Sequence, residues 1–383
     1  MADRVCTNFI DSDGLDLGCH LVSKEYMLEA YPELAPWMKA PGLWVWGRNS
    51  CGALGDNSLV NESSPVQTIS AGTNWKQVDA AAFHSGAIKT DGTLWLWGSG
   101  FSGRLGNNAI VNASSPVQTI SGGTNWKQLS IYGDSSAAIK TDGTLWLWGR
   151  GDYLPNNLSG TANNRSSPVQ TISGGTNWKQ VSLGYFHGTS IKTDGTLWTW
   201  GSASGGRLGN NCNTINMSSP VQTISGGTDW KQVSAGREHT AAIKTNGTLW
   251  LWGGNTGNLG DNTTINRSSP VQTVSGGTNW KQVKISSAIK TDGTLCIWGG
   301  ARISSPVQTI SGGTNWRETA SYAAIKTDGT LWFHRTNSNG NGGVGNNSTI
   351  AISSPVQTVS GGTGWRQVVT SAATLAIRDE EEY

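Results

Sequence analysis

Apolar and polar positions follow one pattern along this chain, and the pattern returns about every 50 residues. In one copy, an apolar run ends at Ile88, the polar stretch 89–93 follows, and residues 94–98 read L-W-L-W-G. Side chains alternate between the two faces of a strand, so the two leucines lie on one face and the two tryptophans on the other. A strand that is apolar on both faces is covered on both sides, as in the stacked sheets of a β-propeller.

Two further segments recur with the same period, which indicates a repeat protein. The motif S-S-P-V-Q-T occurs seven times, beginning at Ser63, Ser114, Ser166, Ser218, Ser268, Ser304 and Ser353. A T-N-W-K-Q motif or a close variant follows each copy, with its indole at Trp75, Trp126, Trp178, Trp230, Trp280, Trp316 and Trp365. The segments V-Q-T-I-S and W-K-Q-V supply two more strands, so we expect four strands per unit. No segment of a unit has the 3.6-residue period of a helix.

The hairpin of each unit is predicted to turn at an Asp-Gly pair or its Asn-Gly variant. This dipeptide favours the tight type I′ turn, in which both central residues have positive φ. The pairs begin at Asp91, Asp142, Asp194, Asn246, Asp292 and Asp328.

The two ends of the repeat region complement each other. The first tryptophan strand, residues 42–47, has no A-I-K-T-D segment before it, and residues 372–379 have no tryptophan strand after them. If these halves pair, the last blade is built from both ends and no open sheet edge remains. We therefore expect an all-β, seven-bladed propeller at residues 42–378, with a short N-terminal non-repeat arm at 1–41 and an acidic tail at 379–383.

These repeats resemble the regulator of chromosome condensation repeat family. Loops of the L-G-[DN]-N type begin at Leu54, Leu105, Leu208 and Leu259, and a complete G-x-x-H-T element spans residues 236–240. The resemblance implies a seven-bladed propeller. In the form seen here, the chain is similar to propeller-bearing virion proteins of bacteriophages. The sixth unit lacks the loop and has shortened neighbouring segments, so we expect irregular blades there.

The composition excludes some classes of partner. Charged residues make up 14% of the chain, against roughly 25% in typical soluble proteins, and the net charge is +2. That charge does not indicate nucleic acid as a partner, and no apolar run approaches the roughly 20 residues that span a bilayer. The five scattered cysteines match neither a disulfide framework nor a zinc site.

No residue pattern indicates catalysis, a cofactor or a metal, so we expect a non-enzyme. His84, His187 and His239 share one repeat position, and we interpret them as hydrogen-bonded structural histidines; the alternative is that they converge on the axis around a metal ion. The indoles predicted to hold the blades together are Trp44, Trp46, Trp95, Trp97, Trp146, Trp148, Trp198, Trp200, Trp250, Trp252, Trp298 and Trp332.

Two sets of cations recur with the repeat, and on a closed ring each forms a circle. The first circle follows the T-N-W tryptophan: Lys76, Lys127, Lys179, Lys231, Lys281, Arg317 and Arg366. The second precedes the turn: Lys89, Lys140, Lys192, Lys244, Lys290, Lys326 and Arg378. The favoured interpretation is solvated strand ends that prevent edge aggregation. The alternative is a surface that faces a polyanion, such as an anionic glycan or an acidic protein.

The arm differs in kind from the repeats. Ser23 is predicted to cap a short helix at 24–31 that Pro32 ends. Its apolar residues form either a segment packed on the ring or an anchor to a larger assembly: Leu21, Tyr26, Met27, Tyr31, Trp37 and Met38.

The leading hypothesis is a non-enzymatic structural or adhesion protein on the virion surface of a tailed bacteriophage, assembled in the host cytoplasm. Few charges, many small polar residues, near-identical repeats and the lack of a recognisable signal peptide favour it. The expected partners are other virion proteins through the arm and a host glycan or receptor, with neither nucleic acid nor membrane insertion. The alternative is a bacterial surface propeller that binds glycan or protein. A small-GTPase exchange factor is disfavoured, because the prolines from Pro65 to Pro270 are spaced regularly and leave no room for a protruding wedge.

Overall fold

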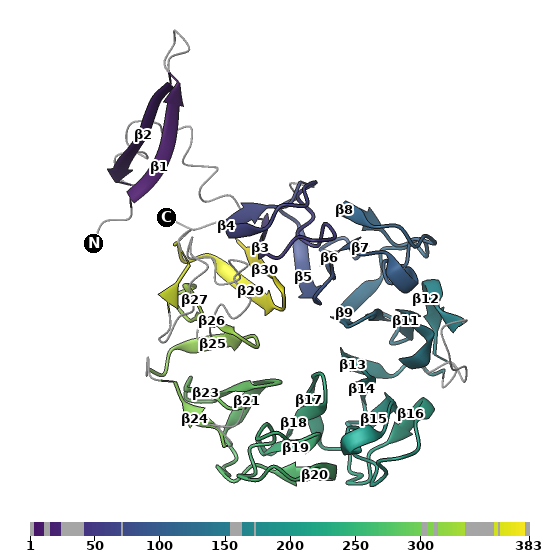
Figure 1. The fold of residues 1–383 in the computed structure, drawn as a ribbon. Helices are drawn as coiled ribbons and strands as arrows, with labels where there is room; N and C mark the ends of the chain where they lie inside the picture. Colours follow the sequence, from purple (N-terminus) through teal and green to yellow (C-terminus); the bar gives the residue numbers. More distant parts are fainter. Residues whose placement is uncertain are drawn as a thin grey trace.

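The computed structural model shows a closed ring of seven four-stranded antiparallel sheets around a central channel (Figure 1). The described residues are 4–10, 16–23, 42–69, 72–153, 163–171, 174–299, 305–309, 313–333, 356–358 and 361–379. The prediction of an all-β, seven-bladed propeller is confirmed. Among the described residues, no helix has the length and apolar character needed to cross a membrane.

Every blade uses the same strand order from the channel outward, although the seventh draws its strands from both ends of the repeat region. The innermost strands are β5 (Trp75–Ala80), β9 (Trp126–Tyr132), β13 (Trp178–Leu183), β17 (Trp230–Ala235), β21 (Trp280–Lys284), β25 (Trp316–Thr319) and β29 (Trp365–Thr370). The second strands are β6 (His84–Lys89), β10 (Ser135–Lys140), β14 (His187–Lys192), β18 (His239–Lys244), β22 (Ser287–Lys290), β26 (Ala323–Lys326) and β30 (Ala373–Arg378).

The tryptophan strands come third and the proline-containing motif comes last. The third strands are β7 (Leu94–Gly98), β11 (Leu145–Gly149), β15 (Leu197–Gly201), β19 (Leu249–Gly253), β23 (Leu295–Ile297), β27 (Leu331–Phe333) and β3 (Gly42–Gly47). The outermost strands are β8 (Ala113–Gln118), β12 (Arg165–Gln170), β16 (Met217–Gln222), β20 (Arg267–Gln272), β24 (Val307–Gln308), β28 (Val356–Gln357) and β4 (Glu62–Gln67). Short 3-10 turns are η2 (Phe101–Gly103), η3 (Gly151–Tyr153) and η5 (Ser204–Gly206).

One sheet joins the two ends of the repeat region, as the sequence predicts. Strand β30 lies between β29 and β3, with Leu43 opposite Ile377 and Gly47 opposite Ala373. Leu375 is fully buried in this sheet. Because β30 supplies the central pairing partner, the ring closes without a free edge at the junction.

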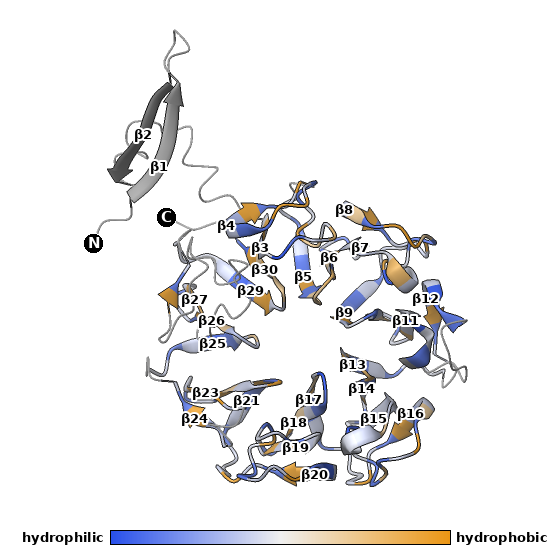
Figure 2. Cartoon of the chain, in the orientation of Figure 1, coloured by the Kyte–Doolittle hydropathy of each residue, from blue (hydrophilic) through white to orange (hydrophobic). Residues whose placement is uncertain are grey.

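The core lies between the blades rather than inside a single sheet. At one junction, Leu94 and Leu96 of one blade pack against Trp126 and Trp148 of the next. The same arrangement recurs at other junctions, so each sheet has a leucine face and an indole face. Figure 2 shows apolar residues on strands from the channel to the periphery. Both faces of the tryptophan strands are covered, in agreement with the double-sided apolar pattern.

The type I′ prediction for the Asp-Gly turns is wrong. Gly92 has positive φ but Asp91 does not, and the Gly92 amide donates to the Lys89 carbonyl while the Lys89 amide donates to Thr93. The loop therefore has three residues, a type I turn followed by a left-handed glycine. The Asp91 carboxylate accepts bonds from the amide and hydroxyl of Thr93, and that hydroxyl accepts from the Trp95 indole (2.9 Å). These local bonds hold the aspartate at negative φ and orient the indole.

A β-bulge interrupts the start of every innermost strand. In the first of them, Trp75 lies opposite Lys89 and Gln77 lies opposite Ile88, so Lys76 is the extra residue. The same shift occurs in the other six innermost strands. The bulge turns the tryptophan and Val78 toward the same core and leaves the lysine exposed.

The outermost strand comprises S-S-P-V-Q rather than the predicted V-Q-T-I-S segment. Its central proline, for example Pro65, lacks an amide proton and so weakens this exposed edge as a template for pairing.

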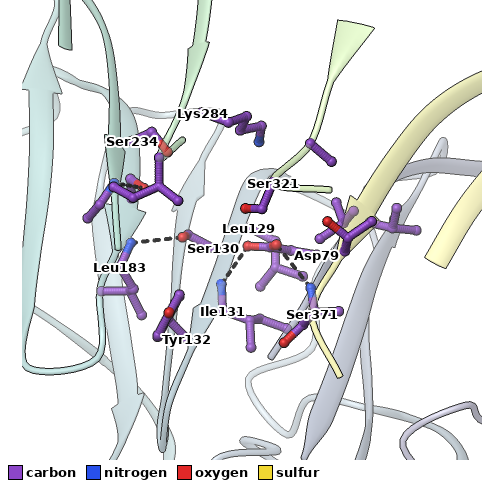
Figure 3. A pocket seen from close by; sticks show the side chains of 18 of the residues that line it. Asp79, Leu129, Ser130, Ile131, Tyr132, Leu183, Ser234, Lys284, Ser321 and Ser371 are labelled. Atoms are coloured by element: carbon purple, nitrogen blue, oxygen red, sulfur yellow. Dashed lines mark hydrogen bonds between the residues drawn. The ribbon is translucent and has the colours of Figure 1, made fainter. Parts of the chain in front are cut away.

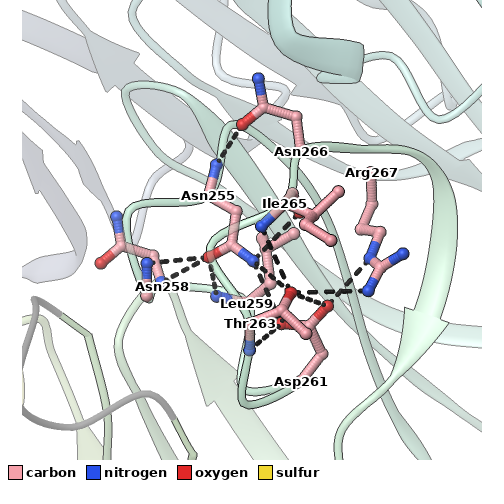
Figure 4. Close-up of polar contacts among 9 residues, drawn as sticks. Asn255, Asn258, Leu259, Asp261, Thr263, Ile265, Asn266 and Arg267 are labelled. Atoms are coloured by element: carbon pink, nitrogen blue, oxygen red, sulfur yellow. Dashed lines mark hydrogen bonds and ion pairs between the residues drawn. The ribbon is translucent and has the colours of Figure 1, made fainter.

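The loops before the outermost strands are held by asparagine side chains. In the loop shown in Figure 4, the Asn255 side chain bonds to both ends of the loop and to Asp261, while Asn266 accepts from the Asn255 amide. Asn61 plays the part of Asn266 in another blade. The asparagine of each repeated N-x-S sequence thus closes its own loop.

The blade formed by β21–β24 and the next one, β25–β28, are the irregular ones, as expected from the shortened sixth unit. Their outermost strands contain two residues each, against six in the regular blades. The arm contains a hairpin that the sequence analysis did not predict, β1 (Arg4–Ile10) with β2 (Asp16–Ser23). Ser23 ends β2, and the predicted helix at 24–31 lies outside the described residues.

Deleting residues 373–383 should prevent a stable ring from forming, because β29 and β3 then lose their shared partner. We expect a loss comparable to the whole stability of a domain, about 5–15 kcal/mol, measured by thermal or denaturant unfolding. Deleting residues 379–383 alone is the control and should leave the melting curve almost unchanged. A cooperative, wild-type melt of the longer deletion would contradict the closure.

Candidate binding site at the channel mouth

The innermost strands of six blades and residues 320–322 of the β25–β28 blade enclose a central cavity of about 590 Å³, part of which is shown in Figure 3. Polar and aliphatic residues of these strands line it, together with loops at one end. We call these loops, together with Tyr132 at the end of β9, the loop rim. The loops join the innermost to the second strand of each blade and comprise residues 81–83, 133–134, 184–186, 236–238, 285–286, 320–322 and 371–372. The opposite end of the channel, where the Asp-Gly turns lie, is the turn end.

Glutamine side chains clasp neighbouring innermost strands along the channel. The Gln180 amide group donates to the Val233 carbonyl (2.9 Å) and accepts from the Val233 amide (3.1 Å) in the next blade. Gln128 makes the same two bonds to Val181. In the described residues, no backbone ladder joins one sheet to the next. The glutamine side chains supply hydrogen bonds between neighbouring innermost strands, so the channel wall is continuous.

The side chain two residues after the glutamine also bonds to the innermost strand of the next blade. The Ser130 hydroxyl accepts from the Leu183 amide (2.9 Å), and the Asp79 carboxylate accepts from the Ile131 amide (2.7 Å). Asp79 is half-buried, and desolvation raises the pKa of its carboxyl to about 6, while the positive charge of Lys284 acts in the opposite direction. Burial also raises the pKa of Glu318. The channel therefore holds two acidic side chains near one lysine among hydroxyls and amides.

The loop rim carries a contiguous arc of aromatic and arginine side chains. Tyr132 meets Tyr185 edge-on at 6.4 Å, and Tyr185 meets Phe186 at 4.5 Å. The Arg237 guanidinium lies 5.7 Å from the Tyr185 ring, and its side chain is 72% exposed. Tyr322, in another loop of the rim, is 40% exposed. Burial raises the pKa of Tyr132 to about 12. Tyrosine and arginine are the residues that most often dominate binding energy at interfaces.

Ion pairs fix the base of this arc. Arg207 is buried and pairs with Glu238 at 2.6 Å, while its guanidinium lies 4.9 Å from the Phe186 ring. Arg104 is also buried and pairs with Asp134 at 2.9 Å. These arginines join loops of adjacent blades, so the exposed aromatic side chains stand on a rigid support.

The three repeat histidines each bond to the following blade. His84 Nε2 lies 3.1 Å from the Ser136 hydroxyl, His187 Nε2 lies 2.8 Å from the Thr240 hydroxyl, and His239 Nε2 lies 3.2 Å from the Ile285 carbonyl. Burial lowers their pKa values, to about 3 for His187 and about 4 for His239. Across the described ranges, no three His, Cys, Asp or Glu side chains gather as metal ligands would.

The predicted structural tryptophans fall into two groups. Trp46, Trp97, Trp148, Trp200, Trp252 and Trp298 are buried between blades, and Trp44, Trp95, Trp146, Trp198, Trp250 and Trp332 are half-buried toward the turn end. The second-circle lysines cover the latter; Lys89 Nζ lies 4.9 Å from the Trp75 ring and 4.7 Å from the Trp95 ring. The first-circle lysines are exposed on the bulges.

Of the predicted anchor residues, only Leu21 falls in a described element, β2. Tyr26, Met27, Tyr31, Trp37 and Met38 lie outside the described residues. The sequence analysis missed the glutamine clasps and the aromatic arc. The signal for the clasps was present, since glutamine stands two residues after the T-N-W tryptophan in six of the seven units.

Comparison with known proteins supports the repeat assignment. The model of the regulator of chromosome condensation (RCC1) repeat matches residues 42–88 and 194–243, and a second model of that repeat matches 178–207 and 230–258. The chain thus carries RCC1 repeats in a seven-bladed propeller.

Among curated proteins, the chain is similar to the ultraviolet-B receptor UVR8 of Arabidopsis thaliana, with 30% identity over 56% of this chain and 50% of the receptor. It is 27% identical to the mitochondrial RCC1 domain-containing protein RUG3 of the same plant, over 58% of this chain and 52% of that protein. The chain therefore spans about half the length of these two relatives.

Solved structures share the fold. Human WBSCR16 aligns with a TM-score of 0.77 at 16% identity, covering 89% of this chain and 99% of that one. Prp20p from Saccharomyces cerevisiae aligns with a TM-score of 0.75 at 14% identity, covering 89% and 92%. At these identities the likeness concerns the fold alone.

Replacing Gln180 with alanine should lower the free energy of unfolding by about 1–3 kcal/mol, because the amide and carbonyl of Val233 lose their partners. Gln282→Ala is the matched control: its Oε1 has no hydrogen-bond partner among the described residues, so the loss should be smaller. Equal losses in urea titrations would show that the clasp contributes nothing.

The buried histidines should make the ring sensitive to acid. Between about pH 6.5 and pH 4 the unfolded chain takes up protons at these sites while the folded chain does not, so stability falls as the pH falls. Asp79 acts in the opposite direction, since its folded pKa lies above the unfolded value. His187→Gln should reduce the pH slope of the unfolding free energy by up to about 1.4 kcal/mol per pH unit. Superimposable slopes for the variant and the wild type would contradict this.

Proposed function

We propose that this protein is a non-enzymatic binding protein whose loop rim engages a partner at the mouth of the channel. We further propose that it acts on the surface of a bacteriophage virion, as the sequence analysis predicts. The observations that carry the first proposal are the unit-to-unit differences in the loop rim and the aromatic arc that lies there.

The seven units are nearly identical in the strands and turns that build the ring, and they differ at the loop rim and in the loops before the outermost strands. The T-N-W tryptophan and the P-V-Q motif occur in every unit, and the turn threonine in nearly all. At the rim, by contrast, one unit has Ala82-Phe83, another Tyr185-Phe186, a third Arg237-Glu238 and a fourth Tyr322. A framework that repeats while one loop set diverges is typical of a scaffold that presents a binding surface.

The rim also collects a particular set of side chains. Five of the chain's twelve tyrosines and phenylalanines lie there, although the core is built mostly from tryptophan and aliphatic residues: Phe83, Tyr132, Tyr185, Phe186 and Tyr322. Rings with few rotamers lose little entropy on binding, and an exposed arginine next to them adds a charged contact. These features support a protein or glycan partner.

The virion role rests on the sequence alone. It assigns the arm to docking on other virion proteins and the ring to display, with a host glycan or receptor as the external partner. In the alternative, a bacterial surface propeller, the same rim binds the partner, and the protein lies on a bacterial cell instead of a virion. Prp20p is described by its binding to Gsp1p and histones; at 14% identity, that activity is not transferred to this chain.

The double variant Arg237→Ala/Tyr322→Ala should fold normally and lose partner binding. The protein should be detected in purified particles by immunoblot, and the free wild-type chain should compete with those particles for adsorption to host cells. The variant should compete at least tenfold less well, since each hot-spot side chain contributes about 1–2 kcal/mol or more.

Arg165→Ala/Phe101→Ala is the matched control, because it removes one arginine and one exposed aromatic ring away from the channel. If this control and the rim variant compete equally well, the rim is not the binding surface. Absence of the protein from particles would instead refute the virion role and leave the rim proposal to be tested on bacterial cells.

A further inference from the structure

We propose that the turn end of the ring is a second binding surface, which takes an anionic polysaccharide. It lies at the opposite end of the innermost strands from the loop rim, so it is independent of the function proposed above. The first circle of cations carries the inference. Its members Lys76, Lys127, Lys179, Lys231, Lys281 and Arg317 are exposed, and Arg366 is half-buried.

The β-bulge is what positions these side chains. Each one is the extra residue that follows the tryptophan paired with the last residue of the second strand, as Lys76 follows Trp75, which lies opposite Lys89. Since the innermost strands surround the channel, the bulges place one cation per blade around its turn end (Figure 1).

The net charge of the whole chain conceals this surface. Residues 42–378 contain 24 Lys and Arg against 14 Asp and Glu, whereas residues 1–41 contain 3 against 7 and residues 379–383 contain none against 4. The ring alone therefore carries a formal charge of +10, and the acidic ends reduce the total to +2. A charge of this size on one body attracts polyanions.

Cations at the two ends of the channel differ in their pairing. Near the loop rim, arginines are matched with acids, as in Arg104 with Asp134 and Arg207 with Glu238. Within the described part of the chain, no ion pair involves the five lysines of the first circle. Arg366 pairs with Asp379, the first residue of the acidic tail, at 3.1 Å. One member of the circle thus already binds a carboxylate.

The turn aspartates offset the positive charge of the second circle of cations rather than that of the first circle. The hydrogen bonds from Thr93 lower the pKa of Asp91, with a smaller contribution from Lys89, so this carboxylate stays ionised beside the second-circle lysine. The same holds for Asp142 with Lys140. The first circle remains as the excess positive charge of this end.

The surface suits a polysaccharide better than a nucleic acid. Proteins that bind single-stranded nucleic acid offer open aromatic rings for base stacking. Here Trp75 is buried, and the Lys89 ammonium lies over the rings of both Trp75 and Trp95. The turns also expose threonine and asparagine side chains, which can bond to sugar hydroxyls, beside the exposed turn aspartates. Lysine is a flexible point charge that accommodates scattered sulfates or carboxylates without a fixed geometry.

The test compares polyanions on the full chain at an ionic strength of about 0.15 M. Heparin and polygalacturonate are the polysaccharide probes, and a single-stranded DNA of similar charge is the nucleic-acid probe. We expect a polysaccharide to bind with an affinity that falls as salt rises. Lys76→Gln/Lys127→Gln/Lys179→Gln should weaken binding at least about tenfold and flatten the salt dependence, because three charge contacts are lost.

Arg48→Gln/Arg165→Gln/Arg267→Gln is the control of equal charge away from the turn end, and its affinity should stay within about twofold of the wild type. Melting curves of both triple variants check the fold. An equal loss of polysaccharide affinity in the two variants would show that binding depends on net charge alone and would overturn the proposed site. Preference for DNA over both polysaccharides would replace the proposed ligand with a nucleic acid, and no binding of any probe would refute the surface.

Discussion

The contact between the leucine face of one sheet and the indole face of the next is the interaction on which this structure depends. Leu94 and Leu96 cluster with Ile88 and Val117 of their own sheet, and Trp126 and Trp148 of the following blade cover this apolar face. A single blade would leave both its faces in water, at a cost of roughly 1.5–3 kcal/mol for each large side chain. The blades are therefore stable only together, and the closing sheet decides whether all of them are covered.

Polar contacts then fix how the blades meet. The glutamine clasps, the repeat histidines and the buried arginines all join residues of adjacent blades, and each satisfies backbone or side-chain groups that the apolar contact buries. Buried polar groups without partners would cost about 1–3 kcal/mol each, so these bonds select one register among the many that leucine and tryptophan alone would allow. The result is a rigid ring with two chemically different ends.

The two ends divide the binding chemistry between them. At the loop rim, charges are paired and aromatic rings are partly exposed, which suits a partner recognised by shape and apolar contact. At the turn end, aromatic rings are covered by ammonium groups, and the lysines of the first circle form no ion pair with any other described residue, which suits a partner recognised by charge. Both ends are built on the same innermost strands, so a ligand at one end contacts the same rigid wall as a ligand at the other.

The sequence by itself determined the seven units, their four strands, the double-sided burial of the tryptophan strand and the closure through residues 42–47 and 373–378. These features follow from alternation along a strand and from which half-unit is missing at each end, and both are local properties of the chain. Only the tertiary structure decided the three-residue turn at Asp91-Gly92, the bulge at Lys76, the partner of Gln180 and the arc around Tyr185. The turn depends on a bond from the Thr93 hydroxyl to the aspartate, and the bulge depends on the pairing of β5 with β6. The Gln180 contact and the arc around Tyr185 join residues about 50 positions apart. Their meeting is set by the twist and stacking of whole sheets, which no local pattern encodes.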